Sequence, residues 1–458
     1  MNRTDTICAI STPPGIGGIA VARVSGPDAI IITDSLWTGR TPLSEAKTHT
    51  AHFGRISDSE GKQLDEAVAT VFRAPHSFTG DDIVEISVHG SRFVQRELIS
   101  SLINAGCRLA EPGEFTRRAF TAGRMDLAEA EAVADIIASN SRAAHRIALS
   151  QMRGDYSRKL NSLRDKLIDL SALLELELDF SEEEVEFASR TQLREIAANI
   201  NTEVSRLHKS FAAGTAIKEG IPVAIVGPTN AGKSSLLNAI VGDDRAIVSD
   251  IRGTTRDTIE ETLEQGDYLF RFIDTAGLRD TSDTIERQGI ERSRRAIAKA
   301  RIVILVVDPA EPIDSDLITS LTELPHLIVA INKTDRTDPA EAHASLQQLL
   351  GHQANIIHIS AKNATGIDAL LQGLEQCARI DNGSADEGLL VTNARHAQAL
   401  GLALRSSAAI LDGLDSNLPG DLIAQGLRET IHHLSTITAT ITTTDILSTI
   451  FSRFCIGK

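Results

Sequence analysis

Four short polar motifs lie in order between residues 227 and 362, each after an apolar run that predicts a strand. Their sequences are Gly-Pro-Thr-Asn-Ala-Gly-Lys-Ser at 227–234, Asp-Thr-Ala-Gly at 274–277, Asn-Lys-Thr-Asp at 332–335 and Ser-Ala-Lys at 360–362. The glycines of the first motif let backbone N–H groups wrap a phosphate, while its lysine and serine suit phosphate oxygens and Mg²⁺. The sequence therefore predicts a phosphate-binding loop in preference to an ordinary glycine turn.

The residues around this loop place it at a strand-to-helix turn. Residues 221–226 form an apolar run short enough for a buried strand, and residues 233–241 predict a helix whose N-terminus points at the phosphates. Lys233 is then expected to reach the β- and γ-phosphates, and Ser234 is expected to ligate Mg²⁺.

The other three motifs complete a guanine nucleotide site. Asp274 suits a water-mediated contact with Mg²⁺, and the N–H of Gly277 can meet the γ-phosphate. Asp335 can accept hydrogen bonds from N1–H and the exocyclic amine of guanine, a donor pattern that adenine lacks, and such a site discriminates by roughly 10⁴-fold or more. The N–H groups of residues 360–362 can meet guanine O6. The four motifs together predict GTP and magnesium.

One residue of the usual catalytic set is missing. Ras-type enzymes orient the attacking water with a glutamine just after the second motif, but here Gly277 is followed by Leu278. A bound cation, a carboxylate further along or a partner's residue could take its place. Residues 283–292 predict a helix that carries Glu286, and spacing alone favours an ordinary solvated helix face for that residue.

Composition narrows the class of protein. The 458 residues suggest roughly three domains, and a hydrophobic content of 42% is enough for real cores. A formal charge of −16 argues against a generic nucleic-acid coat. The cysteines lack Cys-x₂-Cys spacing, which argues against zinc, and they are Cys8, Cys107, Cys377 and Cys455. The sequence lacks a leader pattern and a membrane-length apolar run, so we expect a cytoplasmic protein without a membrane partner.

The first 120 residues read as a small α+β domain. Strands are predicted at 18–26, 66–72 and 83–88 between glycine or proline breakers, and a helix is predicted from 92 to 105. Residues 121–215 then form a first helical part, with helical spacing at 126–139 and 158–178.

A capping box at 181–184 predicts a further helix from about 182, with helical pattern continuing to about 212. The acidic cluster at 175–186 is either a cation or partner site or a solvated helix cap.

Residues 216–378 alternate strand and helix patterns, which predicts a mostly parallel sheet with helices on both faces. After an Asp-Asn-Gly-Ser linker at 381–384, helices are predicted at 394–414, 421–434 and 443–451, within a second helical part from 379 to 458. The nucleotide domain is thus expected to be inserted into a helical domain, where nucleotide turnover could move the helices.

Six further motifs extend the picture over nearly the whole chain. They are Thr-Pro-Pro-Gly at 12–15, Pro-Gly-Glu-Phe-Thr at 112–116, Asn-Ala-Gly-Lys-Ser-Ser-Leu-Leu-Asn at 230–238, Gly-Thr-Thr-Arg-Asp at 253–257, Asn-Ala-Arg-His at 393–396 and Phe-Cys-Ile-Gly-Lys at 454–458. With these motifs the chain resembles the MnmE (TrmE) family of tRNA-modification GTPases from Thr12 to Lys458.

The resemblance implies GTP hydrolysis coupled to modification of the wobble uridine of certain tRNAs. It implies a homodimer formed through the N-terminal domain, and a heterotetramer with an MnmG (GidA) type partner that uses FAD and NADH. The two proteins together would add an aminomethyl or carboxymethylaminomethyl group to carbon 5 of the base. A tetrahydrofolate derivative (5-formyl or methylene) would supply one carbon.

The resemblance also implies an answer to the missing glutamine. A potassium ion would take the place of an arginine finger, with activity rising when two GTPase domains meet. The ligand positions implied for this ion are Asn230, Ser249, Ile251 and Thr254. Thr255 matches a second Mg²⁺ ligand, and Glu286 matches the carboxylate that orients water, so that Glu286, Lys233 and Asn230 are the expected catalytic set. The arrangement is plausible because a cation near the β–γ bridge neutralises developing negative charge.

The motifs and the resemblance together define the expected nucleotide contacts. These residues are Asn230, Ala231, Gly232, Lys233, Ser234, Ser235, Ser249, Asp250, Ile251, Arg252, Gly253, Thr254, Thr255, Asp274, Thr275, Ala276, Gly277, Asn332, Lys333, Asp335, Ser360, Ala361 and Lys362. Arg252 adds a charge near the expected potassium loop and would weaken cation affinity unless its side chain points to solvent.

A folate site is implied in the N-terminal domain. Its positions are Arg23, Glu85, Arg124 and the terminal Lys458, with Cys455 near them. A carboxylate such as Glu85 suits the N–H donors of a pterin ring, and cationic side chains suit the glutamate tail. Surface salt bridges, and an inert small side chain at Cys455, are the alternatives. Arg124 stands where the family often has lysine.

In the second helical part, three residues depart from the family's frequent Gly, Glu and Gly. They are Ser435, Thr436 and Ala439, in a predicted turn between helices, so they bear on loop shape more than on chemistry.

Two other functions use the same nucleotide motifs. A ribosome-assembly or translation GTPase would need neither the N-terminal domain nor the Cys-Ile-Gly-Lys tail. A structural switch that recruits partners without turnover is compatible with Leu278.

Overall fold

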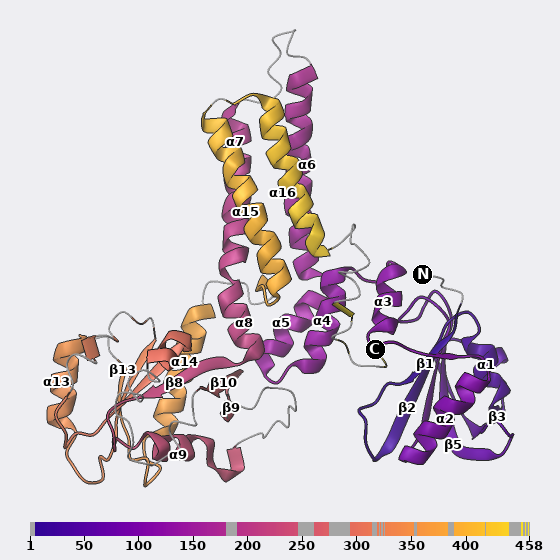
Figure 1. The fold of residues 1–458 in the computed structure, drawn as a ribbon, viewed down its shortest axis with the longest axis horizontal. Coiled ribbons are helices and arrows are strands. Elements are labelled where there is room, and N and C mark those ends of the chain that lie inside the picture. The colour runs from indigo at the N-terminus through magenta and orange to yellow at the C-terminus, as the bar shows by residue number, and fades with distance from the viewer. Residues whose placement is uncertain are drawn as a thin grey trace. The chain divides into compact units, whose positions relative to one another are not determined.

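The computed structural model describes most of the chain. The described residues are 5–179, 190–245, 261–273, 294–313, 318–319, 321, 324, 326–351, 355–382, 389–416, 418–438, 450–451, 454 and 457. They fall into two compact units (Figure 1). The first comprises Met1–Ala134, Met152–Asp165 and Ile431–Lys458, and the second comprises Asp135–Gln151 and Lys166–Thr430.

The first unit is built on a seven-stranded sheet in the order β3-β4-β5-β6-β2-β1-β7. Its strands are β1 Ile7–Ile10, β2 Gly17–Ser25, β3 Trp37–Gly39, β4 Thr50–Ser57, β5 Gln63–Phe72, β6 Ile83–Gly90 and β7 Arg108–Leu109. All neighbouring pairs are antiparallel except β1 with β7. The predicted strands at 18–26, 66–72 and 83–88 correspond to β2, β5 and β6, each within three residues of the predicted bounds.

Alternation along the strands separates the two faces of this sheet. Ala20, Ala22 and Val24 of β2 point to a core that also contains residues of α1 (Ala29–Ser35) and α2 (Arg92–Asn104). The predicted helix at 92–105 is thus confirmed as α2, with Ala105 as its C-cap.

Helix α3 (Glu114–Thr121) follows β7 and is fixed by a buried carboxylate. Glu114 is 3% exposed and accepts hydrogen bonds from Arg108, Arg118 and the backbone N–H of Glu111. Burial raises the pKa of Glu114, but these donors outweigh burial and hold the pKa below its usual value. An ionised Glu114 therefore clamps α3 to the sheet edge, and this clamp sets the position of Phe115.

The second unit combines long helices with the nucleotide domain. Its helices α7 (Arg190–Lys209), α8 (Phe211–Glu219) and α15 (Ala394–Asp415) lie wholly inside it. Helices α4 (Leu127–Ala138), α5 (Arg142–Met152), α6 (Asp155–Asp179) and α16 (Gly420–Thr438) contribute residues to both units. Helices α7 and α15 pack side by side, joined by the Arg194–Asp415 ion pair and by an Asn201–Ser407 hydrogen bond (Figure 1).

The helices predicted at 126–139, 158–178, 394–414 and 421–434 are confirmed as α4, α6, α15 and α16. Helix α16 runs on to Thr438, so the turn expected at Ser435 and Thr436 is wrong and both residues are helical. The predicted helices from 182, at 283–292 and at 443–451 involve residues outside the described ones, as do the side chains of the acidic cluster from 175 onward. Among the described residues, no helix combines the length and apolar character that a membrane crossing requires.

The nucleotide domain has a six-stranded sheet in the order β13-β12-β11-β8-β10-β9. Its strands are β8 Ile221–Val226, β9 Glu261–Gln265, β10 Tyr268–Phe272, β11 Ile302–Val307, β12 Leu327–Ile331 and β13 Asn355–His358. Only β9, at one edge, is antiparallel to its neighbour. The mostly parallel sheet expected between 216 and 378 is therefore observed.

Helices cover both faces of this sheet, and they include α9 (Lys233–Arg245), α13 (Ala340–Leu350) and α14 (Ile367–Asn382). The helical conformation of α9 is interrupted at Gly242, directly after the predicted end at 241. One core cluster of the sheet also takes in Ala143, Ala144 and Ile147 of α5. A helix that precedes the nucleotide domain in the chain thus shares its core.

Candidate functional site

The loop between β8 and α9 has the backbone of a phosphate cradle. Gly227, Asn230 and Gly232 all adopt positive φ values, of 145°, 63° and 95°. A Cβ at Gly227 would lie 2.2 Å from the carbonyl oxygen of Val306, and one at Gly232 would lie 2.2 Å from Asn332 Nδ2. Only glycine fits these two positions, so the spacing of the motif follows from close backbone approach.

Lys233 reaches back across this loop. Its Nζ donates to the carbonyl oxygens of Gly227, at 2.9 Å, and Pro228, at 2.7 Å. Burial lowers the pKa of Lys233 because desolvation disfavours the ammonium form. Ser234 and Ser235 follow in the first turn of α9, whose N-terminus favours negative charge. The cradle therefore concentrates positive potential where a phosphate would lie.

Asn332 ties this cradle to the loops after β12 and β13. The side chain is 3% exposed, Nδ2 donates to the carbonyl oxygen of Ala231 at 2.8 Å, and Oδ1 accepts from the N–H of Ala361 at 2.9 Å. Both ends of the amide are satisfied, so one side chain sets the spacing of three loops.

The rest of the Asn-Lys-Thr-Asp loop is anchored on the residues around Ser360. Thr334 donates from its backbone N–H and from Oγ1 to the carbonyl oxygen of Ile359. Ser360 Oγ donates to Asp335 Oδ1 at 2.7 Å, and this hydrogen bond is the largest influence holding the pKa of Asp335 below its usual value. Asp335 is therefore an ionised acceptor with one oxygen already oriented.

Asp308 is the residue that the sequence motifs did not reveal. It follows β11 directly, and Oδ2 accepts from Lys333 Nζ at 2.6 Å. Its signal in the sequence is a carboxylate at the end of the apolar run 302–307, beside strands that carry the motifs. Lys333 itself has φ 61°.

Sheet order explains why these residues meet. Strands β8, β11, β12 and β13 are parallel neighbours, so their carboxyl ends share one edge of the sheet. Strand β8 lies between β10 on one side and β11 on the other, so the order of strands along the chain changes direction at β8. Ligands of such sheets bind at this switch point. Ala361 is buried here and Lys362 is exposed.

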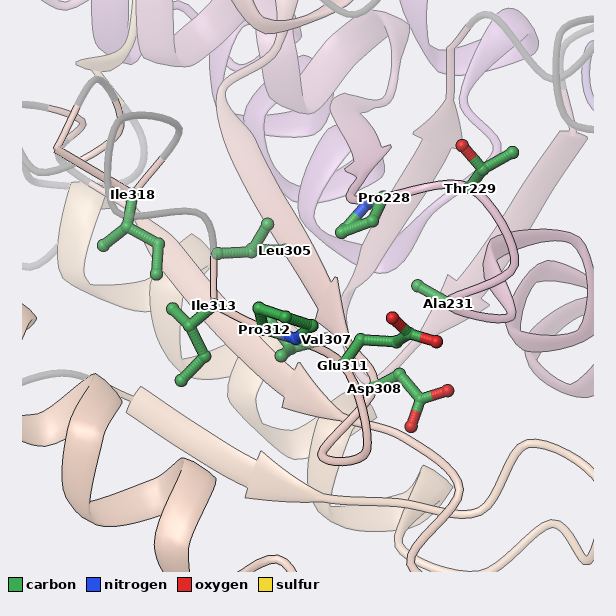
Figure 2. A pocket seen from close by; sticks show the side chains of 10 residues that line it. All are labelled: Pro228, Thr229, Ala231, Leu305, Val307, Asp308, Glu311, Pro312, Ile313 and Ile318. Atoms are coloured by element: carbon green, nitrogen blue, oxygen red, sulfur yellow. The ribbon is translucent and has the colours of Figure 1, made fainter.

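A small cavity lies beside the phosphate loop, lined by Pro228, Thr229, Ala231, Leu305, Val307, Asp308, Glu311, Pro312, Ile313 and Ile318. Figure 2 shows the carboxylates of Asp308 and Glu311 on the side near Ala231, with Ile313 and Ile318 on the opposite side. A volume of about 20 Å³ holds about one water molecule.

The structure brings together two of the expected folate residues. Arg23 of β2 and Glu85 of β6 are register partners, and Arg23 donates from Nε and Nη2 to Glu85 Oε1 at 2.9 and 2.7 Å. The Arg23 guanidinium lies 5.6 Å from the ring centroids of both Phe78 and Phe115. Arg124 is exposed, and within the described residues no ion pair joins it to Glu85.

The C-terminal segment reaches the same unit. Ser11 Oγ donates to the carbonyl oxygen of Gly457 at 3.0 Å, which places the residue before Lys458 against the end of β1. Phe451 and Phe454 pack with Leu127 and Ala130.

Several expected site residues lie outside the described ones. They are Ser249, Asp250, Ile251, Arg252, Gly253, Thr254, Thr255, Asp274, Thr275, Ala276, Gly277, Glu286, Cys455 and Lys458.

Comparisons with known proteins give the family. A model described as the N-terminus of the GTP-binding protein TrmE matches residues 6–124, and a model of the MnmE helical domain matches residues 127–455. The tRNA modification GTPase MnmE of Parabacteroides distasonis is 50% identical over 99% of this chain and 100% of its own length. This chain belongs to the MnmE family. Its expected membership is thereby confirmed, and it is a GTP hydrolase of that family.

Further MnmE relatives are similar to this chain over nearly its whole length. The tRNA modification GTPases MnmE of Bacteroides fragilis and Cytophaga hutchinsonii are 48% and 47% identical, over 99% and 100% of this chain and 99% and 98% of theirs. The MnmE helical-domain model spans both helical parts and the sheet between them, as expected for an inserted domain.

Among solved structures, the G domain of the T. maritima FeoB iron transporter covers 34% of this chain and 98% of its own, at 24% identity and a TM-score of 0.26. The bacterial selenocysteine-specific elongation factor EF-Sec covers 35% of this chain and 29% of its own, at 22% identity and a TM-score of 0.27.

Proposed function

We propose that this GTPase couples GTP turnover to addition of a (carboxymethyl)aminomethyl group at carbon 5 of the wobble uridine of certain tRNAs. The observation that carries the nucleotide half is the side chain of Asn332, which spans from the carbonyl of Ala231 to the N–H of Ala361. A phosphate cradle and a guanine-reading loop joined in this way form one nucleotide site. The names of the MnmE relatives support the tRNA half.

Each part of the nucleotide would be bound by residues of one loop. Residues Asn230 to Ser235 would bind the phosphates, Asp335 would accept from the guanine edge, and residues Ser360 to Lys362 would donate to O6. Residues 249–255 and 274–277 would complete the phosphate end. Lys233 would exchange its carbonyl partners for phosphate oxygens, which are stronger acceptors for an ammonium.

The donor set suits hard cations. Ser234, at the start of α9, is a hydroxyl of the kind that Mg²⁺ accepts, and Thr255 and Asp274 (through water) would join it. The Asn230 side-chain oxygen, with Ser249, Ile251 and Thr254, would hold K⁺. Asn230 is exposed, so its side chain is accessible from the nucleotide side. The cations would supply positive charge that neutralises charge developing on the phosphates.

Glu286 would orient the attacking water, since Leu278 cannot. Within the N-terminal sheet, Arg23, Glu85, Arg124 and Lys458 would bind a tetrahydrofolate derivative, 5-formyl or methylene. The Arg23–Glu85 pair supports this proposal because it offers a cation and a carboxylate side by side. Cys455 would lie near the folate.

The N-terminal sheet supports dimerisation. Phe53 of β4 and Val68 of β5 are register partners on the face opposite the α1–α2 core, and they are 67% and 39% exposed. Such a face favours burial against a second copy. We further propose a heterotetramer with an MnmG type partner that carries FAD and uses NADH, a cytoplasmic location, and activation when two GTPase domains meet. The domain limits would be 1–120, 121–215, 216–378 and 379–458.

Salt dependence of the GTPase rate tests the nucleotide proposal. We expect a higher rate in KCl than in NaCl, and we expect Asn230→Ala to remove the difference while leaving a slow basal rate. Equal rates of the wild-type protein in both salts would contradict the proposed potassium site.

Nucleoside mass spectrometry of tRNA from a deletion strain tests the modification proposal. Loss of the modified wobble uridine, restored by the wild-type gene, is the expected result. Unchanged wobble uridines would favour a ribosome-assembly or translation GTPase instead. Titration calorimetry of the full-length protein with 5-formyltetrahydrofolate tests the folate site, and an absence of heat would count against it.

A further inference from the structure

Asp308 lies where the end of β11 meets the loop that follows β12. Its strand β11 pairs in parallel with β12 so that Val307 aligns with Ile331, and the N–H of Asn332 donates to the carbonyl of Val307. Asp308 is therefore one step beyond the sheet on β11, beside the start of the Asn-Lys-Thr-Asp loop. The Asp308 and Lys333 side chains are 10% and 29% exposed, and they meet at 2.6 Å.

Both oxygens of this carboxylate are in use. Oδ2 accepts from Lys333, while Oδ1 accepts from the N–H of Ala310 at 3.0 Å. The Asp308 carbonyl also accepts from the N–H of Glu311. A carboxylate held at two points cannot swing away, so it presents a fixed negative charge to Lys333.

Lys333 needs such an external restraint. Its φ of 61° is a left-handed conformation that residues with a Cβ adopt only when their surroundings impose it. The neighbouring motif residues are tied elsewhere: Asn332 to the phosphate loop and to Ala361, and Asp335 to Ser360. Lys333 is the motif residue whose side chain is held by Asp308, directly after β11.

We propose that Asp308 is a positioning residue for guanine nucleotide binding, acting by fixing Lys333 in its place between Asn332 and Asp335. This inference rests on the proposed nucleotide site. Asp308 itself would not touch the nucleotide. It would lower the entropy that Lys333 loses on binding, and a restraint of this kind strengthens affinity without new contacts.

The change Asp308→Asn separates the two tasks of the carboxylate. An amide oxygen still accepts from the N–H of Ala310, but the charge that holds Lys333 is lost. We expect the dissociation constants of GDP and GTP to rise by the same factor of about ten, since the restraint acts at the base end. The rate at saturating GTP is expected to stay unchanged, so that the loss appears in KM.

Fluorescence titration of the full-length protein with N-methylanthraniloyl GDP and GTP measures these constants. Glu311→Gln is the matched control, because Glu311 is an exposed carboxylate of the same loop, and its affinity should equal that of the wild-type protein. In a double-mutant cycle, Asp308→Asn should weaken binding little in the background of Lys333→Met. Asp308→Glu, which keeps the charge, should recover part of the affinity.

Four results would overturn the inference. They are unchanged affinity in Asp308→Asn, additive losses in the cycle, a loss confined to the saturated rate, or a fall in the unfolding temperature of the nucleotide-free protein with no rescue by Asp308→Glu. Failure of the proposed function would look different, because the wild-type protein would then bind neither guanine nucleotide.

Discussion

Two carboxylates are proposed to accept from the N–H edge of a ligand ring: Asp335 beside the nucleotide sheet and Glu85 in the N-terminal sheet. The neighbours that hold these two carboxylates differ in charge. Asp335 accepts from a neutral hydroxyl, that of Ser360, and it keeps a second oxygen for a ligand. Glu85 is paired with the cation Arg23, which lies against two aromatic rings. Asp335 is oriented by a neutral hydroxyl, whereas the charge of Glu85 is neutralised by Arg23.

The difference determines what a ligand must displace. A guanine edge would meet Asp335 without breaking an ion pair, so affinity there depends on how well the surrounding loops are held. A pterin edge would share Glu85 with Arg23, so affinity depends on the free energy of that pair. The two side chains are mostly buried, at 17% and 28% exposed, so a ligand that shares Glu85 must itself donate to the carboxylate. Four substitutions can break or sharpen this contrast.

The largest effect is expected for Asn332→Ala. It removes the amide that joins Ala231 to Ala361 and leaves a buried N–H and a buried carbonyl without partners, so nucleotide affinity should fall by about a hundredfold. Titration with fluorescent GDP measures the loss. Asn363→Ala, an exposed amide three residues from Ser360, is the control and should bind normally. A loss below tenfold would show that the loops keep their spacing without Asn332.

Glu114→Gln tests the clamp under the N-terminal site. Removing the charge that Arg108 and Arg118 face should lower the free energy of unfolding of this unit by about 2 kcal/mol at pH 7. The chain's one tryptophan, Trp37, is buried in this unit, so its fluorescence during denaturation reports the change.

The effect should depend on pH in a defined direction. The pKa of Glu114 is depressed in the folded protein, so its stabilisation is full above the ordinary carboxyl pKa and is lost as pH falls through the folded value. The difference in stability between wild type and variant should therefore shrink as pH falls below the ordinary carboxyl pKa, and it should vanish only below the lower folded value. Curves that stay parallel would exclude the ion network as the cause.

Arg23→Ala should weaken binding of 5-formyltetrahydrofolate by about tenfold, because Glu85 loses its neighbour and the cation is gone. Calorimetry on the full-length protein measures this affinity. Arg96→Ala removes a comparable cation that lies over the exposed Phe93, and it should have no effect. If both variants bound alike, the Arg23–Glu85 pair would be a plain salt bridge.

The smallest effect is expected for Ser360→Ala. Asp335 loses its oriented oxygen but stays ionised at neutral pH, so GDP affinity should drop by about threefold. Since this hydroxyl is the main cause of the lowered pKa of Asp335, the variant should lose affinity at a higher pH than wild type during acidification. Coincident pH profiles of the two proteins would contradict the assignment.

Local patterns predicted the nucleotide domain better than the N-terminal one. Strand β8 has the predicted bounds, because an uninterrupted apolar run between breakers predicts a buried strand of a parallel sheet. In the N-terminal sheet, β4 mixes exposed and buried residues and was not predicted, since its pairing with β5 depends on contacts that a local pattern does not contain. The short β3 and β7 are defined by their partners alone.

The same distinction holds for the sites. Asn332 and Asp335 were predicted because the motif is contiguous. Asp308 was not, because its role depends on the alignment of Val307 with Ile331 across two strands. Arg23 and Glu85, 62 positions apart, were expected from family resemblance, and the register of β2 against β6 supplies the physical reason for their contact.

The packing of α5 has a consequence for dissecting the protein into parts. Arg142 and Arg146 face Asp267 between β9 and β10, the N–H of Ala143 donates to its carbonyl, and Ile147 belongs to the core of the nucleotide sheet. A fragment cut at 216–378 would lose this helix and expose apolar surface that water would otherwise not reach. We expect such a fragment to aggregate, whereas one that retains residues 141–152 joined by a short linker would remain monodisperse. The stretch that folds as one piece is therefore discontinuous along the chain.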